Sequence, residues 1–391
     1  MNRAKKSIEI FQQFFNNEKA GGLILIACTA VSLLIANSSH GDDFVHFWHT
    51  RIPLHFGKII IPFNIEDWIN DGLMTIFFLM VGLEIERELY IGELSTFKNA
   101  ILPALAALGG MAVPALIHFI FCYGKPEAAG NGIPTATDIA FSLGVLSLIG
   151  KRIPLSMKIF LTALAIMDDL GAIIIIGIFY TQTFSFLFLS LALGVFGSLL
   201  FFNKLKINSL WIYLPAGLLL WYFLYRSGVH PTLSGVLLAF AIPFNKKAET
   251  QPSSILQHAL HKPVNFIIIP LFALANTAIR LPNTWKSEIF SANSLGIELG
   301  LLLGKPIGIV GFTLLGISLG ITRLPDGINT RKLIGLGALA GIGFTMSIFI
   351  SNLAFSTDPD LIQSSKFAVL LASLLAAITG WIILKSGEKL Y

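Results

Sequence analysis

Long apolar runs dominate the pattern of this chain. An α-helix rises 1.5 Å per residue and needs about twenty residues to cross a hydrocarbon core of about 30 Å, and most of the runs have about that length. Glycine and proline occur inside them, as they do in membrane helices. The pattern predicts twelve transmembrane spans, near residues 20–37, 67–90, 101–122, 133–150, 155–180, 185–202, 209–225, 229–244, 254–277, 295–319, 332–355 and 362–386.

The composition supports a membrane protein. Hydrophobic residues make up 54% of the chain and charged residues 13%, whereas soluble domains have roughly 25% charged residues. So little charge cannot cover a water-exposed surface. The formal charge of +5 is spread over short loops and forms no patch, so we expect no binding to nucleic acid.

The basic residues predict how the spans are oriented. Most Lys and Arg residues lie in the loops on the side of the two termini, and the positive-inside rule then places both termini in the cytoplasm. Residues 1–20 combine basic residues with an apolar periodicity and lack a cleavage site for a signal peptidase, which favours a helix on the membrane surface.

The segment 51–63 differs from the spans. Its residues alternate around Gly57 and Lys58 and include Pro53 and Pro62, a pattern that predicts a β-hairpin on the outer face. An exposed hairpin edge can pair with a copy of itself, so a homodimer contact there is one interpretation. A loop that only covers the helix ends is the other.

Asp168 and Asp169 are the strongest candidates for chemistry, because an ionisable residue deep in a span costs several kcal/mol. Successive helix residues point about 100° apart, so one carboxylate can face a cavity and the other an adjoining helix. Two carboxylates in a poorly hydrated site repel each other, so the pair can store a proton that a hard cation such as Na⁺ replaces. The alternative, two solvated acids at a helix end, disagrees with the apolar residues on both sides.

Two spans have interrupted helices. Pro134 and the sequence Thr-Ala-Thr precede Asp138 in the fourth span, and four glycines precede Phe344 in the eleventh. Broken segments at corresponding places in two halves point to the midplane site of a transporter. Helix ends meeting there carry unpaired partial charges, which Asp138 and Lys305 could offset. Lys305 is deep enough to need a carboxylate partner, and we predict that Asp168 provides it.

Three histidines are weaker candidates. His230 lies at a span entrance, where a histidine that only forms hydrogen bonds is the simpler interpretation. His258 and His261 lie on the cytoplasmic side and could titrate near neutral pH.

Six stretches of the chain resemble the NhaA-type sodium/proton antiporters. They are Phe-Phe-Leu-Met-Val-Gly-Leu-Glu at 77–84, Pro-Thr-Ala-Thr-Asp-Ile-Ala-Phe at 134–141, Ala-Leu-Ala-Ile-Met-Asp-Asp-Leu-Gly-Ala-Ile at 163–173, Ser-Gly-Val-His at 227–230, Gly-Lys-Pro at 304–306 and Gly-Ile-Gly-Phe-Thr-Met-Ser-Ile-Phe at 341–349. Their order and length make the resemblance specific, and they run through nearly the whole chain.

The resemblance implies a single all-α membrane domain over 1–391, with about twelve transmembrane helices, inverted repeats, two crossed broken helices and a short outer β-hairpin. It implies exchange of intracellular Na⁺ or Li⁺ for external H⁺ in a bacterial inner membrane, with two protons per ion and activation at alkaline pH. Sodium, pH and volume homeostasis would follow. The expected partners are these ions, membrane lipid and a second copy bound through the hairpin, and no cofactor is expected.

The resemblance also assigns site residues. Asp168 and Asp169 would bind the Na⁺ and carry the protons, with Asp138 and Lys305 as the charges at the helix crossing and Thr137 beside them. Glu84, together with His230, His258 and His261, would belong to the pH-responsive region. Glu86 stands where relatives often have Lys, and Gln257 where they can have Glu, so the pH profile follows less directly from the resemblance than the ion chemistry.

Two other functions remain as alternatives. A cation-coupled symporter of a small organic solute would need a roomier polar pocket than these spans offer. An intramembrane aspartyl protease needs two acids on separate helices, whereas Asp168 and Asp169 are adjacent in the sequence.

Overall fold

The structure is a computed structural model that describes residues 18–57, 59–150, 153–180, 184–245, 251–280 and 288–386. The surface helix predicted over residues 1–20 lies almost wholly outside the described residues. The chain divides into two compact units. Unit 1 comprises Met1–Leu33, Phe97–Asp169 and Ile279–Tyr391, and unit 2 comprises Leu34–Thr96 and Leu170–Ala278. Helices α2 (Glu18–Ala36) and α8 (Leu155–Phe179) contribute residues to both.

Unit 2 is built of helices and one small sheet. Its elements are α3 (Gly41–Trp48), β1 (Leu54–Phe56), β2 (Ile59–Ile61), α4 (Ile65–Asp67), η1 (Trp68–Leu73), α5 (Met74–Tyr90), η2 (Glu93–Ser95), α9 (Phe186–Lys204), α10 (Leu210–Ser227), α11 (Leu233–Ala241), α12 (Pro252–Pro263), η4 (Val264–Ile268) and α13 (Ile269–Asn276). Glycines bring α5 and α11 together: a Cβ at Gly235 would lie 2.2 Å from the carbonyl oxygen of Thr75. Close approach through small residues is typical of helix packing in membranes.

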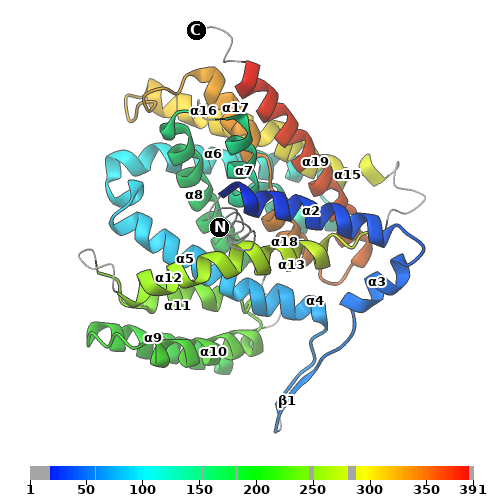
Figure 1. Cartoon of the computed structure of the whole chain (residues 1–391), viewed down its shortest axis with the longest axis vertical. Coiled ribbons are helices and arrows are strands. Elements are labelled where there is room, and N and C mark those ends of the chain that lie inside the picture. The colour runs from blue at the N-terminus through cyan, green and yellow to red at the C-terminus, as the bar shows by residue number, and fades with distance from the viewer. Residues whose placement is uncertain are drawn as a thin grey trace, which may run out of the picture. The chain divides into compact units, whose positions relative to one another are not determined.

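The predicted hairpin is present. β1 and β2 pair antiparallel, with Leu54 opposite Ile61 and Phe56 opposite Ile59. Gly57 has a φ of +61°, in the left-handed region that glycine adopts without a steric penalty. The two strands extend beyond the flanking helices α3 and α4 (Figure 1).

Unit 1 consists of long helices and two bent helix pairs. Its elements are α6 (Phe97–Cys122), η3 (Pro126–Thr135), α7 (Ile139–Ile149), α15 (Ala292–Leu299), η5 (Gly300–Gly304), α16 (Lys305–Ser318), α17 (Thr330–Ala340), α18 (Phe344–Ala354) and α19 (Pro359–Ser386). Helices α6 and α16 touch through backbone: a Cβ at Gly308 would lie 2.0 Å from the carbonyl oxygen of Gly109. Only glycine fits this contact.

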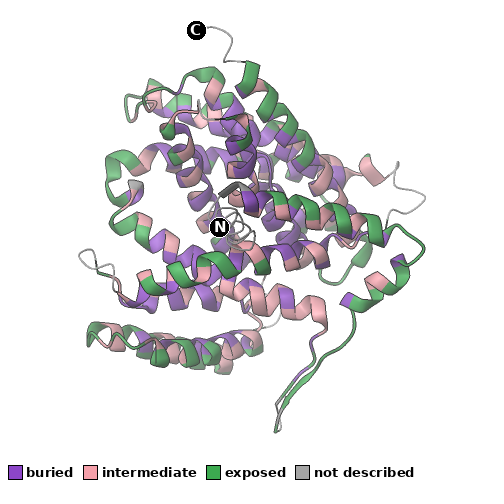
Figure 2. Cartoon of the chain, in the orientation of Figure 1, coloured by how far each residue is buried: buried purple, intermediate pink, exposed green. Residues whose placement is uncertain are grey.

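Each of the twelve predicted spans contains helix, but the count of twelve is not confirmed. Among the described residues, seven continuous helices are long and apolar enough to cross a membrane, or up to nine with the two bent pairs. Helix α11 has 9 residues, which is short for a bilayer crossing. Large apolar side chains remain exposed on α9 and α10, among them Phe186 and Leu218. Figure 2 colours parts of both helices as exposed. Such faces are expected where the solvent is lipid.

The two predicted helix breaks are both present in unit 1. Helices η3 and α7 form one bent pair, at 44°, and α17 and α18 the other, at 45°. Residues of α18 from Phe344 to Ser351 are buried, so this second break lies in the interior.

We predict that the stability of unit 1 depends on the close backbone contact between α6 and α16. Gly308→Ala places a methyl group against Gly109 and should lower the free energy of unfolding by about 1–3 kcal/mol. Gly311→Ala is the matched control, because a Cβ there meets no atom within 4 Å, and it should keep or raise the stability. Thermal unfolding in detergent measures both. Equal melting temperatures for the two variants would contradict this description of the packing.

Candidate ion-binding site

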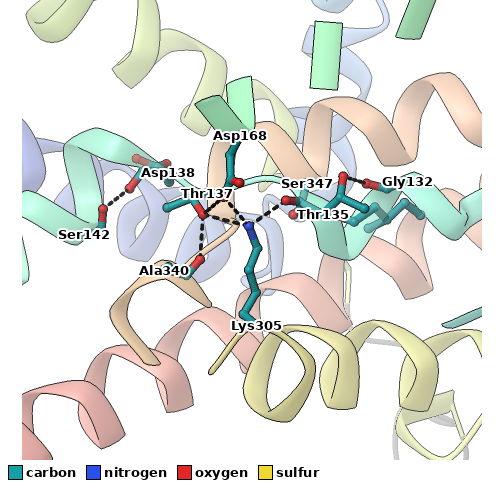
Figure 3. Close-up of polar contacts among 10 residues, drawn as sticks. Gly132, Thr135, Thr137, Asp138, Ser142, Asp168, Lys305, Ala340 and Ser347 are labelled. Atoms are coloured by element: carbon teal, nitrogen blue, oxygen red, sulfur yellow. Dashed lines mark hydrogen bonds and ion pairs between the residues drawn. The ribbon is translucent and has the colours of Figure 1, made fainter. Parts of the chain in front are cut away.

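The two helix breaks of unit 1 lie against each other. The backbone N–H of Asp138, in the first break, donates to the carbonyl oxygen of Ile342, in the second, at 2.7 Å. Glycine makes the approach possible: a Cβ at Gly343 would lie 3.2 Å from the carbonyl oxygen of Ala136. The broken spans predicted from separate parts of the sequence therefore form one structural feature (Figure 3).

Asp138 caps two helices at once. It is the N-cap of α7, and its Oδ1 accepts from the N–H of Phe141 at 2.9 Å. Its Oδ2 accepts from the N–H of Thr345 at 3.1 Å and from the hydroxyl of Thr345 at 2.7 Å, in the first turn of α18. A carboxylate is stabilised at a helix N-terminus by the free N–H groups and by the helix dipole. Asp138 thus offsets the positive N-terminal ends of α7 and α18, the second helices of the two bent pairs.

Lys305 lies at a helix end of the opposite polarity, the C-terminal end of η3. Its side chain is fully buried, and Nζ donates to the carbonyl oxygen of Thr135 at 2.6 Å, to the hydroxyl of Thr137 at 2.9 Å and to Asp168 Oδ2 at 2.5 Å (Figure 3). All three ammonium protons are used. Thr135 is the last residue of η3, so the cation lies where a helix exposes its carbonyl oxygens.

The Thr137 hydroxyl connects Lys305 to both breaks. It accepts from Lys305 Nζ and lies 2.7 Å from Asp168 Oδ2 and 2.9 Å from the carbonyl oxygen of Ala340, the last residue of α17. A hydroxyl has one hydrogen, so it donates to only one of these two oxygens at a time. The choice couples Asp168 to the end of α17.

A local change of helix type precedes Lys305. Gly300–Gly304 is a π-helical segment, in which the N–H of Lys305 donates to the carbonyl oxygen of Gly300. Pro306, which has no N–H to donate, follows directly. Single π-turns of this kind are frequent at functional sites, where they reorient a side chain.

The predicted ion pair between Lys305 and Asp168 is confirmed. Both side chains are fully buried, and Asp169, the next residue of α8, is 2% exposed. The charge of Asp169 also acts on the Lys305 ammonium. Within the described residues, Asp168 Oδ1 has no hydrogen-bond partner. This buried carboxylate thus keeps one oxygen available while the other is held by Lys305 and Thr137.

The structure brings together five of the nine predicted site residues. Asp168, Asp169, Thr137, Asp138 and Lys305 all belong to unit 1, and Glu84, His230, His258 and His261 belong to unit 2. His230 Nε2 lies 3.3 Å from Asp71 Oδ1. Glu84 is half-buried on α5. His258 and His261 are exposed on α12, where His258 Nδ1 contacts the Ser254 carbonyl oxygen at 2.8 Å.

Sequence reasoning missed two residues of interest, Thr345 and Glu298. Thr345, the hydrogen-bond partner of Asp138, could be noted in the sequence only as part of a motif. Its role depends on the contact between the two helix breaks, which are far apart in the sequence. Glu298 was missed although the criterion used for Asp168, an acid inside an apolar span, selects it as well. It is a buried acid seven positions before Lys305 on the same continuous span.

Comparison with known proteins decides the family. The model of the family described as "Na+/H+ antiporter 1" matches residues 12–384. The chain belongs to this family. A Na(+)/H(+) antiporter NhaA of Dechloromonas aromatica (strain RCB) is 53% identical over 387 residues, covering 98% of this chain and 97% of the relative. Na(+)/H(+) antiporter NhaA 1 of Clostridium beijerinckii is 45% identical over 389 residues, covering 98% and 97%. The family resemblance found in the motifs is therefore confirmed along nearly the whole chain.

We predict strong energetic coupling between Lys305 and Asp168. Removing one partner leaves the other buried and uncompensated, at a cost of roughly 3–5 kcal/mol. Lys305→Ala and Asp168→Asn should each lower the melting temperature in detergent, and the double variant should recover part of the sum. The double-mutant cycle measures the coupling. Purely additive losses would show that the contact contributes nothing of its own.

Proposed function

We propose that this chain is a secondary transporter that exchanges intracellular Na⁺ or Li⁺ for external H⁺, with Asp168 and Asp169 binding the ion and the protons in turn. Family membership supports antiport over the symporter and protease alternatives. The observation that carries the site assignment is the state of Asp168: a fully buried carboxylate with one oxygen held by Lys305 and Thr137 and the other without a hydrogen-bond partner among the described residues.

The two adjacent acids explain competition between ion and proton. The buried carboxylates of Asp168 and Asp169 and the buried ammonium of Lys305 together carry a net charge of about −1 when all three are ionised. A proton or a Na⁺ can neutralise that charge, and binding of one then excludes the other. Na⁺ takes oxygen ligands, which the carboxylates supply together with backbone carbonyls and water. Asp169 is the principal ligand in this proposal, because Lys305 engages Asp168 directly.

The charges at the crossing keep the site in place. Lys305 compensates Asp168 and the carbonyl end of η3, and Asp138 compensates the N-termini of α7 and α18. Thr137 can donate to Asp168 or to the Ala340 carbonyl oxygen. Binding of Na⁺ at Asp168 Oδ1 draws negative charge from the carboxylate and weakens Oδ2 as an acceptor for Thr137 and Lys305, so the ion changes the hydrogen bonds of both broken helices.

The finer features of the family complete the proposal. They are twelve spans with inverted repeats, cytoplasmic termini, an inner-membrane location and a homodimer formed through the 51–63 hairpin, whose strand edges are available for pairing. Both helix breaks lie in unit 1 and bend by 44° and 45°, which supports a repeat. Glu84, His230, His258 and His261 form the pH-responsive set of the proposal, which includes activation at alkaline pH, and within this set His230 Nε2 lies 3.3 Å from Asp71 Oδ1.

We predict that Asp169→Asn abolishes sodium-driven proton movement. The variant keeps the shape of the side chain but cannot bind Na⁺ by charge or release a proton. Proteoliposomes with an internal pH dye, given Na⁺, Li⁺ or K⁺, measure the exchange. Asp360→Asn, at an exposed position of α19, is the matched control and should transport normally. Normal proton movement in Asp169→Asn would rule out the assigned site.

We predict that transport responds to membrane potential. If two protons enter for each Na⁺ that leaves, one net charge crosses per cycle, which is worth about 2.3 kcal/mol per 100 mV. Clamping the potential of proteoliposomes with valinomycin and K⁺ should therefore change the exchange rate, faster when the proton-receiving side is negative. Identical rates at all clamped potentials would indicate electroneutral exchange.

A further inference from the structure

His118 is a buried histidine that the ion-binding site described above does not use. It lies near the end of α6, and its side chain is fully buried. Its Nδ1 lies 2.9 Å from Oδ1 of Asn131, in η3, and its Nε2 lies 3.1 Å from Oδ1 of Asn293, in α15. One imidazole ring thus connects α6 with two elements that come from distant parts of the sequence.

Both nitrogens of the His118 ring have a polar partner, so the ring is held at two points. A neutral imidazole carries one N–H, so it donates to one of the two amides and accepts from the NH₂ group of the other. Asn293 is itself fixed, because its Nδ2 donates to Ser365 Oγ, in α19, at 2.8 Å. Buried polar groups that are all satisfied in this way make a rigid connection.

Two glycines allow the ring to lie close to both backbones. A Cβ at Gly130, the residue before Asn131, would lie 3.2 Å from Cε1 of the ring, and a Cβ at Gly296 would lie 2.9 Å from Cδ2. A larger residue at either position would push the ring away from η3 or from α15. The ring therefore fills the space between these two elements and sets how closely they approach.

The η3 side of this connection leads directly to the ion-binding site. Asn131 and Thr135 lie four residues apart in one 3₁₀ helix, which is ~8 Å along its axis. The carbonyl oxygen of Thr135 accepts from Lys305 Nζ at 2.6 Å. A shift of η3 at Asn131 would therefore move this acceptor relative to the ammonium.

The α15 side leads to the same place. The helix that begins with α15 continues through η5 to Lys305 and beyond as one span. Between the ring and the ion pair the two sides stay in contact, since a Cβ at Gly300 would lie 2.8 Å from Cβ of Pro134. His118 thus lies between the two segments whose ends bring Thr135 and Lys305 together.

We propose that His118 is a positioning residue of the ion-binding site: it sets the spacing of η3 and α15 and through them the contact between the Thr135 carbonyl oxygen and the Lys305 ammonium. This inference rests on the proposed function. His118 acts through Lys305 and not on the transported ion. Ser347 also holds η3, because its hydroxyl donates to the Ile133 carbonyl oxygen at 2.6 Å, so loss of the His118 contacts should weaken the site rather than abolish it.

The position of η3 affects Na⁺ binding through the acceptors of Lys305. With the Thr135 carbonyl oxygen in place, the ammonium has three acceptors, and Na⁺ can weaken the one at Asp168 while two remain. If the Thr135 contact is loosened, the ammonium depends more on Asp168, and Na⁺ must compete with it for the charge of that carboxylate. Charge-assisted hydrogen bonds are among the strong ones in proteins, so the apparent affinity for Na⁺ should fall.

The proposal predicts a change in apparent Na⁺ affinity without a comparable change in maximal rate. His118→Leu should raise the Na⁺ concentration for half-maximal exchange roughly three- to tenfold, with the maximal rate within about twofold, because Asp168 and Asp169 are intact. Exchange in proteoliposomes, normalised to folded protein, measures both. His118→Gln, whose amide can still bind one asparagine, should give a smaller rise. His46→Leu makes the same change at an exposed position of α3 and should alter neither value.

Asn131 tests whether the contacts act as one connection. Asn131→Leu should raise the half-maximal Na⁺ concentration, and adding His118→Leu should cause little further rise, because both variants break the same contact. An unchanged half-maximal concentration in folded His118→Leu and Asn131→Leu proteins would overturn the proposal, and so would equal effects of His118→Leu and His118→Gln. If His118→Leu does not fold, His118→Gln and Asn131→Leu make the same comparison.

A stability measurement tests the connection without relying on exchange. Asn293, the contact of His118 on α15, is twelve residues or ~18 Å of helix from Lys305, and substitutions so far apart are normally additive. The proposal instead predicts that Lys305→Ala lowers the melting temperature less in a His118→Gln background, where the Thr135 contact is already weakened. Additive losses would contradict it. Absence of Na⁺-driven proton movement in the unchanged protein would refute the proposed exchange, and the stability result would still decide on His118.

Discussion

The burial of the Lys305 ammonium is the constraint on which unit 1 depends. A fully buried cation costs several kcal/mol unless its three protons are used and its charge is offset. Asp168 supplies the charge, and Thr135 and Thr137 supply the remaining acceptors. These acceptors exist because η3 stops short and exposes its terminal carbonyl groups in the interior. The broken helix and the buried lysine therefore require each other.

The same reasoning applies to Asp138. Its carboxylate lies at two helix N-termini, where three donors from two distant segments, the N–H of Phe141 and the N–H and hydroxyl of Thr345, converge on one charge. The crossing thus carries a cation at exposed carbonyl groups and an anion at exposed N–H groups. In a low-dielectric interior these interactions are strong and only weakly screened. A small change of charge at Asp168 or Asp169 is for that reason felt by all four half-helices, which gives the proposed ion binding a physical route to the backbone.

Much of this site could be predicted from the sequence, for a simple reason. An acid or a lysine inside an apolar run is rare and expensive, so Asp168, Asp169 and Lys305 stand out without any knowledge of the fold. The pairing of Lys305 with Asp168 followed from charge balance alone. The β-hairpin followed from Gly57 between alternating residues bounded by prolines.

Other features depend on tertiary contacts that no local pattern contains. Thr345 becomes a partner of Asp138 only because the second break lies against the first. The count of twelve spans is not confirmed, since apolar length alone does not distinguish a crossing from a short helix such as α11. Glu298 was recognisable by the criterion already applied to Asp168, because it is an acid inside an apolar span.

The central claim is that Na⁺ and protons compete for the Asp168 and Asp169 carboxylates. Isothermal calorimetry of the purified protein, titrated with Na⁺ in two buffers of different ionisation heat, counts the protons released for each ion bound. The account predicts release near neutral pH, with an apparent affinity that tightens as pH rises and levels off once the site has lost its protons. A heat of binding that is the same in both buffers at every pH would mean that Na⁺ binds without displacing a proton, and would contradict it.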